Sequence, residues 1–246
     1  MSTPVNTDTR IVTADMLEHL PEPAQRYLKY TGVIGQPWIN TVRIKYSGIF
    51  RLAADKDWLP IKAEQVYTTN PPGFRWKARL KMAGLWIISG SDTYQGGHGH
   101  MFGKVAGLYT IFDARGEEVD QGTMLRYFNE MMWFPIALLS DRVTWQAVDD
   151  GSCDVTFTDC GKSVTARFIV DELGRLTNFI AKRWYPENKG AYTLETWSTP
   201  MAEWGKLTGL NLPVRAQAVW KLLVGDFPYA DVKLTEVEYN GLIANF

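Results

Sequence analysis

Residues 124–133 form an unusually apolar stretch of the sequence that contains two opposite charges. Arg126 and Glu130 are four residues apart, so in a helix they share one face and can form an ion pair. The apolar residues around them cover more than one narrow stripe of such a helix, which predicts that the helix is largely enclosed. A buried charge needs a partner, either another charge or a ligand. The pair is therefore either a structural ion pair at the rim of the helix or a polar anchor in an apolar pocket.

Aromatic residues are the second feature that could form a binding site. The chain has ten tryptophans in 246 residues, which is a high number. Filling the core of a curved sheet is the default role of each one. Together they could instead line a cavity for a bulky apolar ligand. Under this interpretation the ligand-binding residues are Arg126, Tyr127, Glu130, Trp133, Trp76 and Trp197.

The same pocket would also allow acid–base catalysis. A carboxyl group that is partly buried acquires a raised pKa, because the loss of solvation disfavours its charged form, and it can then exchange protons with a substrate. Glu130 and Asp120 are the candidate catalytic residues for this alternative.

His98 and His100 could begin a metal site, because in a strand both rings point to one face. A catalytic zinc site usually has three protein ligands. A carboxylate such as Asp92 or Asp113 could complete the set, although nothing in the pattern requires it. The simpler interpretation is two polar residues in a Gly-rich turn, and we predict no metal and no cofactor.

Cys153 and Cys160 lie seven residues apart in one expected strand. At about 3.3 Å per residue this spacing is roughly 23 Å, too far for a disulfide. We expect free thiols, one facing the core and one facing solvent, which suits a reducing compartment. The first ten residues also lack the order of a secretory signal, so we expect a cytoplasmic protein.

Charge and motifs exclude several classes of function. The 26 basic and 27 acidic residues nearly cancel and form no basic stripe, so we predict no nucleic-acid partner. The basic residues in the stretch 75–81 alternate with apolar ones, as on the solvated face of a strand. No apolar run approaches the roughly 18 residues of a membrane-spanning helix. The sequence has no phosphate-binding loop, nucleophile elbow or paired-cysteine zinc motif, and it leaves the oligomeric state open.

The periodicity of the chain predicts the elements that position these residues. Residues 13–31 have the pattern of short helices, with Thr13 as an N-cap and Gly32 as a stop signal. Apolar and polar residues then alternate over 42–112 in short runs, the last of them 100–112, between turns that contain Gly or Pro. This alternation predicts antiparallel strands.

The second half of the chain repeats this order after a helical insertion at residues 117–139, with further strands over 143–240. We therefore predict a single domain over residues 1–246. Its fold class is mainly β with α: a curved antiparallel sheet, an incomplete barrel, wraps a central aromatic-rich helix and carries short N-terminal helices.

Residues 20–28, 70–76 and 120–135 carry a resemblance to a known family. The last stretch has the form Asp-Gln-Gly-x-x-Leu-Arg-Tyr-x-x-Glu-x-x-Trp-x-Pro, which is a specific motif. These stretches resemble a bacterial family of uncharacterised proteins, DUF6544 or DUF6920, and the similarity extends to residues 226–229 and 235–239. The resemblance brings no established activity.

The order of strands, helix and strands also resembles the lipoprotein-carrier fold of LolA- and LppX-like half-barrels. In that fold an incomplete antiparallel barrel wraps a helical lid over an apolar cavity that holds acyl chains. The resemblance implies a cavity, although a shared fold does not determine function. The chain departs from those carriers in lacking a secretion signal, which puts a role in shuttling envelope lipids in doubt.

Three functions are compatible with these observations. The leading hypothesis is binding of a hydrophobic small molecule between the curved sheet and the helix at residues 120–134, with Arg126 and Glu130 at its polar end. The alternative is an enzyme, such as an isomerase, cyclase or hydrolase, that acts on an apolar metabolite in the same cavity. A purely structural or partner-binding module would instead have a filled core.

Overall fold

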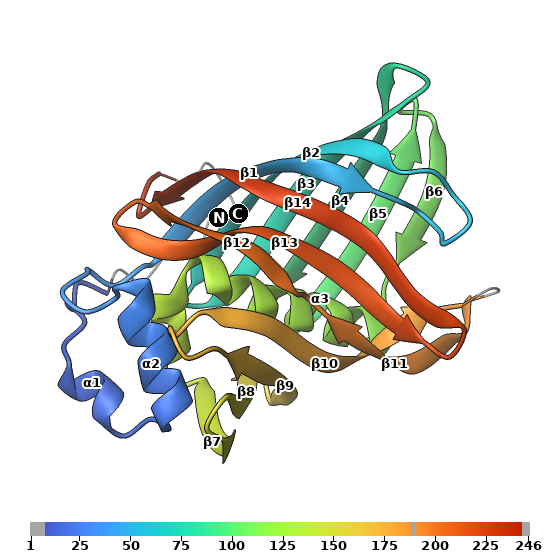
Figure 1. Cartoon of the computed structure of the whole chain (residues 1–246). Coiled ribbons are helices and arrows are strands. Elements are labelled where there is room, and N and C mark those ends of the chain that lie inside the picture. The colour runs from blue at the N-terminus through green and yellow to red at the C-terminus, as the bar shows by residue number, and fades with distance from the viewer. Residues whose placement is uncertain (1–7, 188–189, 243–246) are drawn as a thin grey trace.

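The computed structural model describes residues 8–187 and 190–242. The chain folds into one strongly curved antiparallel sheet that wraps a central helix, and two short helices lie at one end of the sheet (Figure 1). None of the helices in the described residues has the length and apolarity needed to cross a bilayer.

The elements up to the central helix come from the first half of the chain. They are α1 (Asp15–Glu18), α2 (Glu22–Thr31), β1 (Thr41–Phe50), β2 (Leu59–Thr69), β3 (Pro72–Met82), β4 (Leu85–Gln95), β5 (His98–Val105), β6 (Tyr109–Ala114) and α3 (Glu117–Glu130).

Two short 3-10 helices and eight strands follow. They are η1 (Met131–Trp133), η2 (Pro135–Leu139), β7 (Val143–Asp149), β8 (Ser152–Asp159), β9 (Lys162–Val170), β10 (Leu176–Pro186), β11 (Tyr192–Ser198), β12 (Met201–Leu207), β13 (Leu210–Leu222) and β14 (Gly225–Tyr239).

The fourteen strands form a single sheet in the order β6-β5-β4-β3-β2-β1-β14-β13-β11-β10-β9-β8-β7, and β12 pairs with β13. Strands β1 to β6 are a simple meander. The last strand, β14, pairs with β1 and so joins the two sets of strands. This order confirms the predicted fold class of an incomplete antiparallel barrel around a central helix.

Strand β3 illustrates how the sequence pattern produces this sheet. Phe74, Trp76, Ala78 and Leu80 alternate with basic residues, and all four are buried. Because side chains in a strand point alternately to opposite faces, the apolar set faces the interior. The basic residues of the stretch 75–81 lie on the other face, as the alternation predicted.

Helix α3 is buried on most of its circumference, which confirms that it is enclosed. One face packs on an aromatic core; the Phe128 ring lies 5.8 Å from that of Phe157 and 5.3 Å from that of Phe179. The opposite face of α3 carries Gly122, Arg126 and Glu130, which are spaced four residues apart and face a space inside the sheet. The helix therefore separates the packed core from a second space inside the sheet.

Two local predictions were wrong. The run 100–112 is two strands, β5 and β6, joined by a tight turn in which Ala106 and Gly107 have φ of 52° and 71°. Alternation continues through such a hairpin, so the pattern alone gives no sign of the turn.

Thr13 is not a cap, because α1 begins after Ala14 and has no side-chain cap hydrogen bond. Gly32 does end α2, with a left-handed φ of 77°.

Candidate functional site

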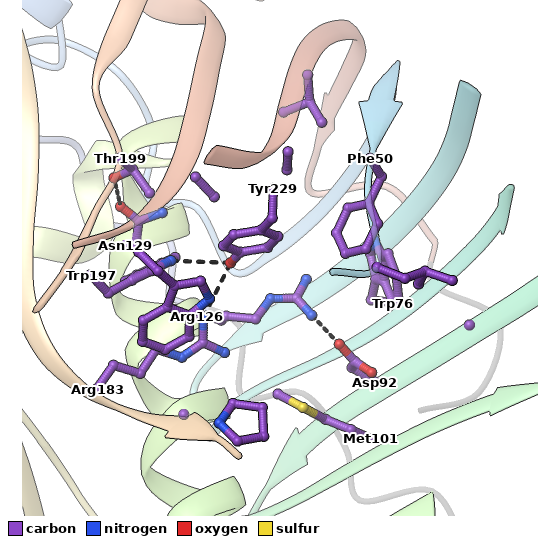
Figure 2. Close-up of a pocket in the computed structure, with 18 of the residues that line it drawn as sticks. Phe50, Trp76, Asp92, Met101, Arg126, Asn129, Arg183, Trp197, Thr199 and Tyr229 are labelled. Atoms are coloured by element: carbon purple, nitrogen blue, oxygen red, sulfur yellow. Dashed lines mark hydrogen bonds and ion pairs between the residues drawn. The ribbon is translucent and has the colours of Figure 1, made fainter. Parts of the chain in front are cut away.

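A cavity of about 540 Å³ lies between α3 and the concave face of the sheet. Most of its wall is aromatic or aliphatic, with side chains from both sets of strands (Figure 2). Its volume is within the range of about 300–1,000 Å³ that is typical of small-molecule sites. The cavity is therefore large enough for a ligand and mostly apolar.

Arg126 forms the centre of a buried polar network on one wall of this cavity. Its guanidinium contacts the Asp92 carboxylate, and its Nη2 lies 3.2 Å from Oε1 of Glu130. The guanidinium carbon also lies 5.1 Å from the ring centre of Phe74 and 5.0 Å from that of Trp76. Both the carboxylates and the aromatic faces stabilise the positive charge.

Two side chains of the sheet donate hydrogen bonds to the second carboxylate oxygen of Glu130. Gln65 donates from Nε2 to Oε2 of Glu130 at 2.6 Å, and the Tyr67 hydroxyl donates to the same oxygen at 3.2 Å. Gln65 Oε1 in turn accepts a hydrogen bond from Arg126. The Arg126–Glu130 ion pair thus connects the helix to the sheet and also forms part of the cavity wall. A structural role for the pair and a role as a polar anchor in the pocket are therefore compatible.

Asp92 is a buried carboxylate in the same wall. Burial raises the pKa of Asp92 above its ordinary value, while the neighbouring Arg126 acts in the opposite direction. Sequence spacing gave no reason to place Asp92 beside the helix, because β4 and α3 meet only through the curvature of the sheet.

A second arginine reaches the cavity from β10. Arg183 is only 6% exposed, and its Nη1 lies 3.4 Å from the Tyr229 hydroxyl (Figure 2). Its guanidinium carbon lies 4.7 Å from the ring centre of Trp197 and 5.4 Å from that of Trp220. Arg183 follows the buried Phe179 and Ala181 at alternate positions of β10, so the alternation places its charge on the inward face of this strand. This signal in the sequence could have identified Arg183 as a candidate site residue.

Five of the six predicted ligand-binding residues line the cavity: Arg126, Glu130, Trp133, Trp76 and Trp197. Tyr127 does not, because it lies on the core face of α3, where its hydroxyl donates to the backbone oxygen of Thr68 at 3.0 Å. We therefore leave Tyr127 out of the candidate site.

Asp120 is also separated from the cavity. Its carboxylate accepts a hydrogen bond from the Gly99 N–H at 2.7 Å and lies 2.9 Å from Lys162 Nζ. Burial would raise the pKa of Asp120, but the Gly99 N–H and Lys162 outweigh this effect and lower it below its ordinary value. The raised pKa considered for a catalytic Asp120 is thus contradicted; this carboxylate attaches the start of α3 to β5.

His98 and His100 have different partners. His98 is 81% exposed at its side chain and lies 3.3 Å from Asp120. His100 lies 2.7 Å from an oxygen of Asp113, and its other ring nitrogen lies 3.0 Å from Arg115. Within the described residues, no three His, Cys, Asp or Glu side chains are grouped as a metal site would require.

Cys153 and Cys160 are free thiols, and Cys153 is buried whereas Cys160 is exposed. The expected difference in exposure is confirmed, but the expected shared strand is not: β8 ends at Asp159, and Cys160 lies in the turn that follows it. Burial raises the pKa of the Cys153 thiol above its ordinary value, and partial desolvation together with the neighbouring Asp159 raises that of Cys160, which disfavours a reactive thiolate.

Solved structures share the architecture at very low sequence identity. A domain from Vibrio parahaemolyticus, described as an outer membrane lipoprotein-sorting protein, is 9% identical with a TM-score of 0.50, over 91% of this chain and 93% of that chain. A LolA superfamily protein from Nitrosomonas europaea is 10% identical with a TM-score of 0.45, over 95% and 96% of the two chains. At this identity the first similarity supports the fold alone.

Comparison of the sequence with functionally curated proteins finds no match. The model of a family of unknown function, DUF6544, matches residues 10–232. This match covers most of the chain and confirms the resemblance predicted from the motif at residues 120–135. The chain therefore belongs to the DUF6544 family.

Proposed function

We propose that the protein binds a hydrophobic small molecule in the cavity between the concave face of the sheet and α3. Trp76, Trp133 and Trp197 contact the apolar body of the ligand, and Arg126 and Glu130 lie beside its polar part. The cavity itself carries this proposal. Its size of about 540 Å³ and its mainly aromatic and aliphatic wall match those of small-molecule binding sites.

The fold supports the same conclusion. The similar domain from Vibrio parahaemolyticus is described as a lipoprotein-sorting protein, and lipoproteins carry acyl chains. A curved sheet that leaves an apolar space beside its helix suits ligands of that kind. By this analogy the ligand of the present chain is an elongated apolar molecule.

The enzyme alternative is supported by one observation. Asp92 is a buried carboxyl group that lines the cavity, so it lies where a residue that exchanges protons with a bound substrate would have to be. Turnover of an apolar metabolite that is lost in Asp92→Asn, while ligand binding is retained, would favour an enzyme. Binding without turnover across a library of such metabolites would favour a carrier.

Titration with Nile red, a neutral dye whose fluorescence rises in apolar surroundings, tests the binding proposal. Ala218 lines the cavity on β13, so Ala218→Trp would fill part of the space and weaken binding at least tenfold. Ala147→Trp makes the same substitution at an exposed position of β7 and serves as the control. Unchanged Nile red affinity in Ala218→Trp would reject the proposal.

A further inference from the structure

The two arginines of the cavity differ in their counter-charges. Arg126 contacts two carboxylates, those of Asp92 and Glu130. Arg183 is equally enclosed, yet within the described part of the chain its guanidinium pairs with no carboxylate, and its Nε has no hydrogen-bond partner at all. An arginine keeps its positive charge under these conditions. Leaving such a charge buried and unpaired is costly.

The surroundings of Arg183 only partly offset this cost. Burial lowers the pKa of Arg183 below its ordinary value, and the positive charge of Arg126 acts in the same direction, whereas Tyr229 opposes both effects. The aromatic faces of Trp197 and Trp220 attract the cation. Asp92 also acts on Arg183 through its charge, but this carboxylate is already paired with Arg126.

Tyr229 adds a hydrogen-bond donor beside this cation. Its hydroxyl oxygen accepts from Trp197 Nε1 at 3.1 Å and from Arg183 Nη1 at 3.4 Å. Both of these bonds use the oxygen as the acceptor. Among the described residues the hydroxyl hydrogen itself donates to none, so it remains available for a ligand. Tyr229 and Arg183 both line the cavity.

The backbone of α3 leaves room at the same place. Gly122 faces Arg183, and a Cβ at this position would lie 3.4 Å from Nε and 3.5 Å from Nη2. A larger side chain would cover the guanidinium. Gly in a helix interior costs stability relative to Ala, so this residue leaves space beside the Arg183 guanidinium at the expense of helix stability.

We propose that Arg183 and the Tyr229 hydroxyl bind the anionic head group of an amphipathic ligand whose alkyl chain occupies the aromatic cavity. The head group is a carboxylate or a phosphate, the anions that match the planar donors of a guanidinium. This inference rests on the proposed function and specifies its ligand class.

Calorimetric titration of the full chain with decanoate, decyl phosphate and decanol tests the inference. The three ligands share one alkyl chain and differ in the head group. The wild-type protein should bind at least one of the anions roughly tenfold or more tightly than decanol, as expected for charge-assisted hydrogen bonds in a buried site. The anion that binds more tightly identifies the head group.

Variants assign the preference to the proposed residues. Arg183→Gln should remove the preference for the anion while decanol affinity changes less than twofold. Tyr229→Phe, which removes only the hydroxyl, should reduce the preference for the anion about threefold. This variant tests the anion site if Arg183→Gln does not fold. Lys182→Gln removes a charge from the exposed face of the same strand and should leave the preference unchanged.

The outcomes separate the two proposals. The anion site would be overturned if the wild-type protein bound decanol and both anions equally. It would also be overturned if the preference for the anion persisted in Arg183→Gln, or persisted at full strength in Tyr229→Phe where Arg183→Gln does not fold. Each of these results would leave the hydrophobic cavity in place. If none of the three ligands nor Nile red binds, the proposed function fails and the anion site fails with it.

Discussion

Arg126 and Glu130 lie one turn apart on α3, and the 3.2 Å contact between Nη2 and Oε1 is buried in the wall of the cavity. Gln65 and Tyr67 of β2 hold the free oxygen of Glu130. The pair therefore connects the helix to the sheet as well as lining the proposed ligand site. Its loss would affect the stability of the fold as well as binding.

Replacing Glu130 by Gln should lower the free energy of unfolding by about 1.5–3 kcal/mol, because charge-assisted hydrogen bonds in a buried site are lost. Urea unfolding followed by tryptophan fluorescence measures the change. The matched control is Glu22→Gln, which breaks the exposed i,i+4 pair with Arg26 on α2 and should cost less than about 1 kcal/mol. Equal effects of the two variants would contradict a structural role for the buried pair.

The attachment of α3 by Asp120 predicts a pH-dependent stability. The pKa of Asp120 is lowered in the folded state, so its contribution is complete above the unfolded pKa of about 3.9 and is lost as the pH falls through the folded value. Asp120→Asn should therefore cost roughly 1–2 kcal/mol at pH 7. In urea unfolding the difference from the wild type should shrink toward pH 3; a constant difference would rule out the charge as its source.

Gly99 allows α3 to approach β5. A Cβ at this position would lie 2.2 Å from Thr123 Oγ1 and 2.7 Å from the backbone oxygen of Val119, so Gly99→Ala would force the helix away from the strand. We expect a loss of about 1–3 kcal/mol or more in the free energy of unfolding. The neighbouring surface variant His98→Ala should change it by less than about 0.5 kcal/mol. Thermal unfolding of both variants checks this contrast.

Gly122→Ala separates stability from binding. A methyl group here makes ordinary contact with the Arg183 guanidinium, and removing glycine from the helix interior should raise stability by about 0.5–1 kcal/mol. The same methyl occupies space beside Nη2 of Arg183, so decanoate affinity should fall more than decanol affinity. A stabilised variant with unchanged decanoate affinity would show that Gly122 does not serve ligand access.

The elements of this fold were predictable because their signals are local. Alternation in β3 and the mixed apolar surface of α3 depend only on neighbouring residues, and both predictions were confirmed. The spacing of Arg126 and Glu130 likewise indicated a helix pair. The turn at Ala106 and Gly107 was missed because alternation continues across it.

The composition of the site was predictable only in part because it depends on long-range pairing. Asp92, Arg183 and Tyr229 come from three strands that are far apart in the sequence, and only the curvature of the sheet brings them to one cavity. Tyr127 and Asp120 were assigned to the site from their place in the helix motif. A motif does not specify which face of the helix a residue occupies in the fold, and both residues point elsewhere.

The central claim is that an apolar ligand enters the cavity between α3 and the sheet, and the indole N–H signals of the protein test it most directly. Five of the ten tryptophans line the cavity, namely Trp76, Trp133, Trp184, Trp197 and Trp220. In a ¹H–¹⁵N spectrum titrated with decanol, we predict that these five signals shift along one saturable curve. The signals of Trp38, Trp145 and Trp204, which pack elsewhere, should stay in place. Saturation without shifts in the cavity signals, or shifts confined to the other tryptophans, would contradict the claim.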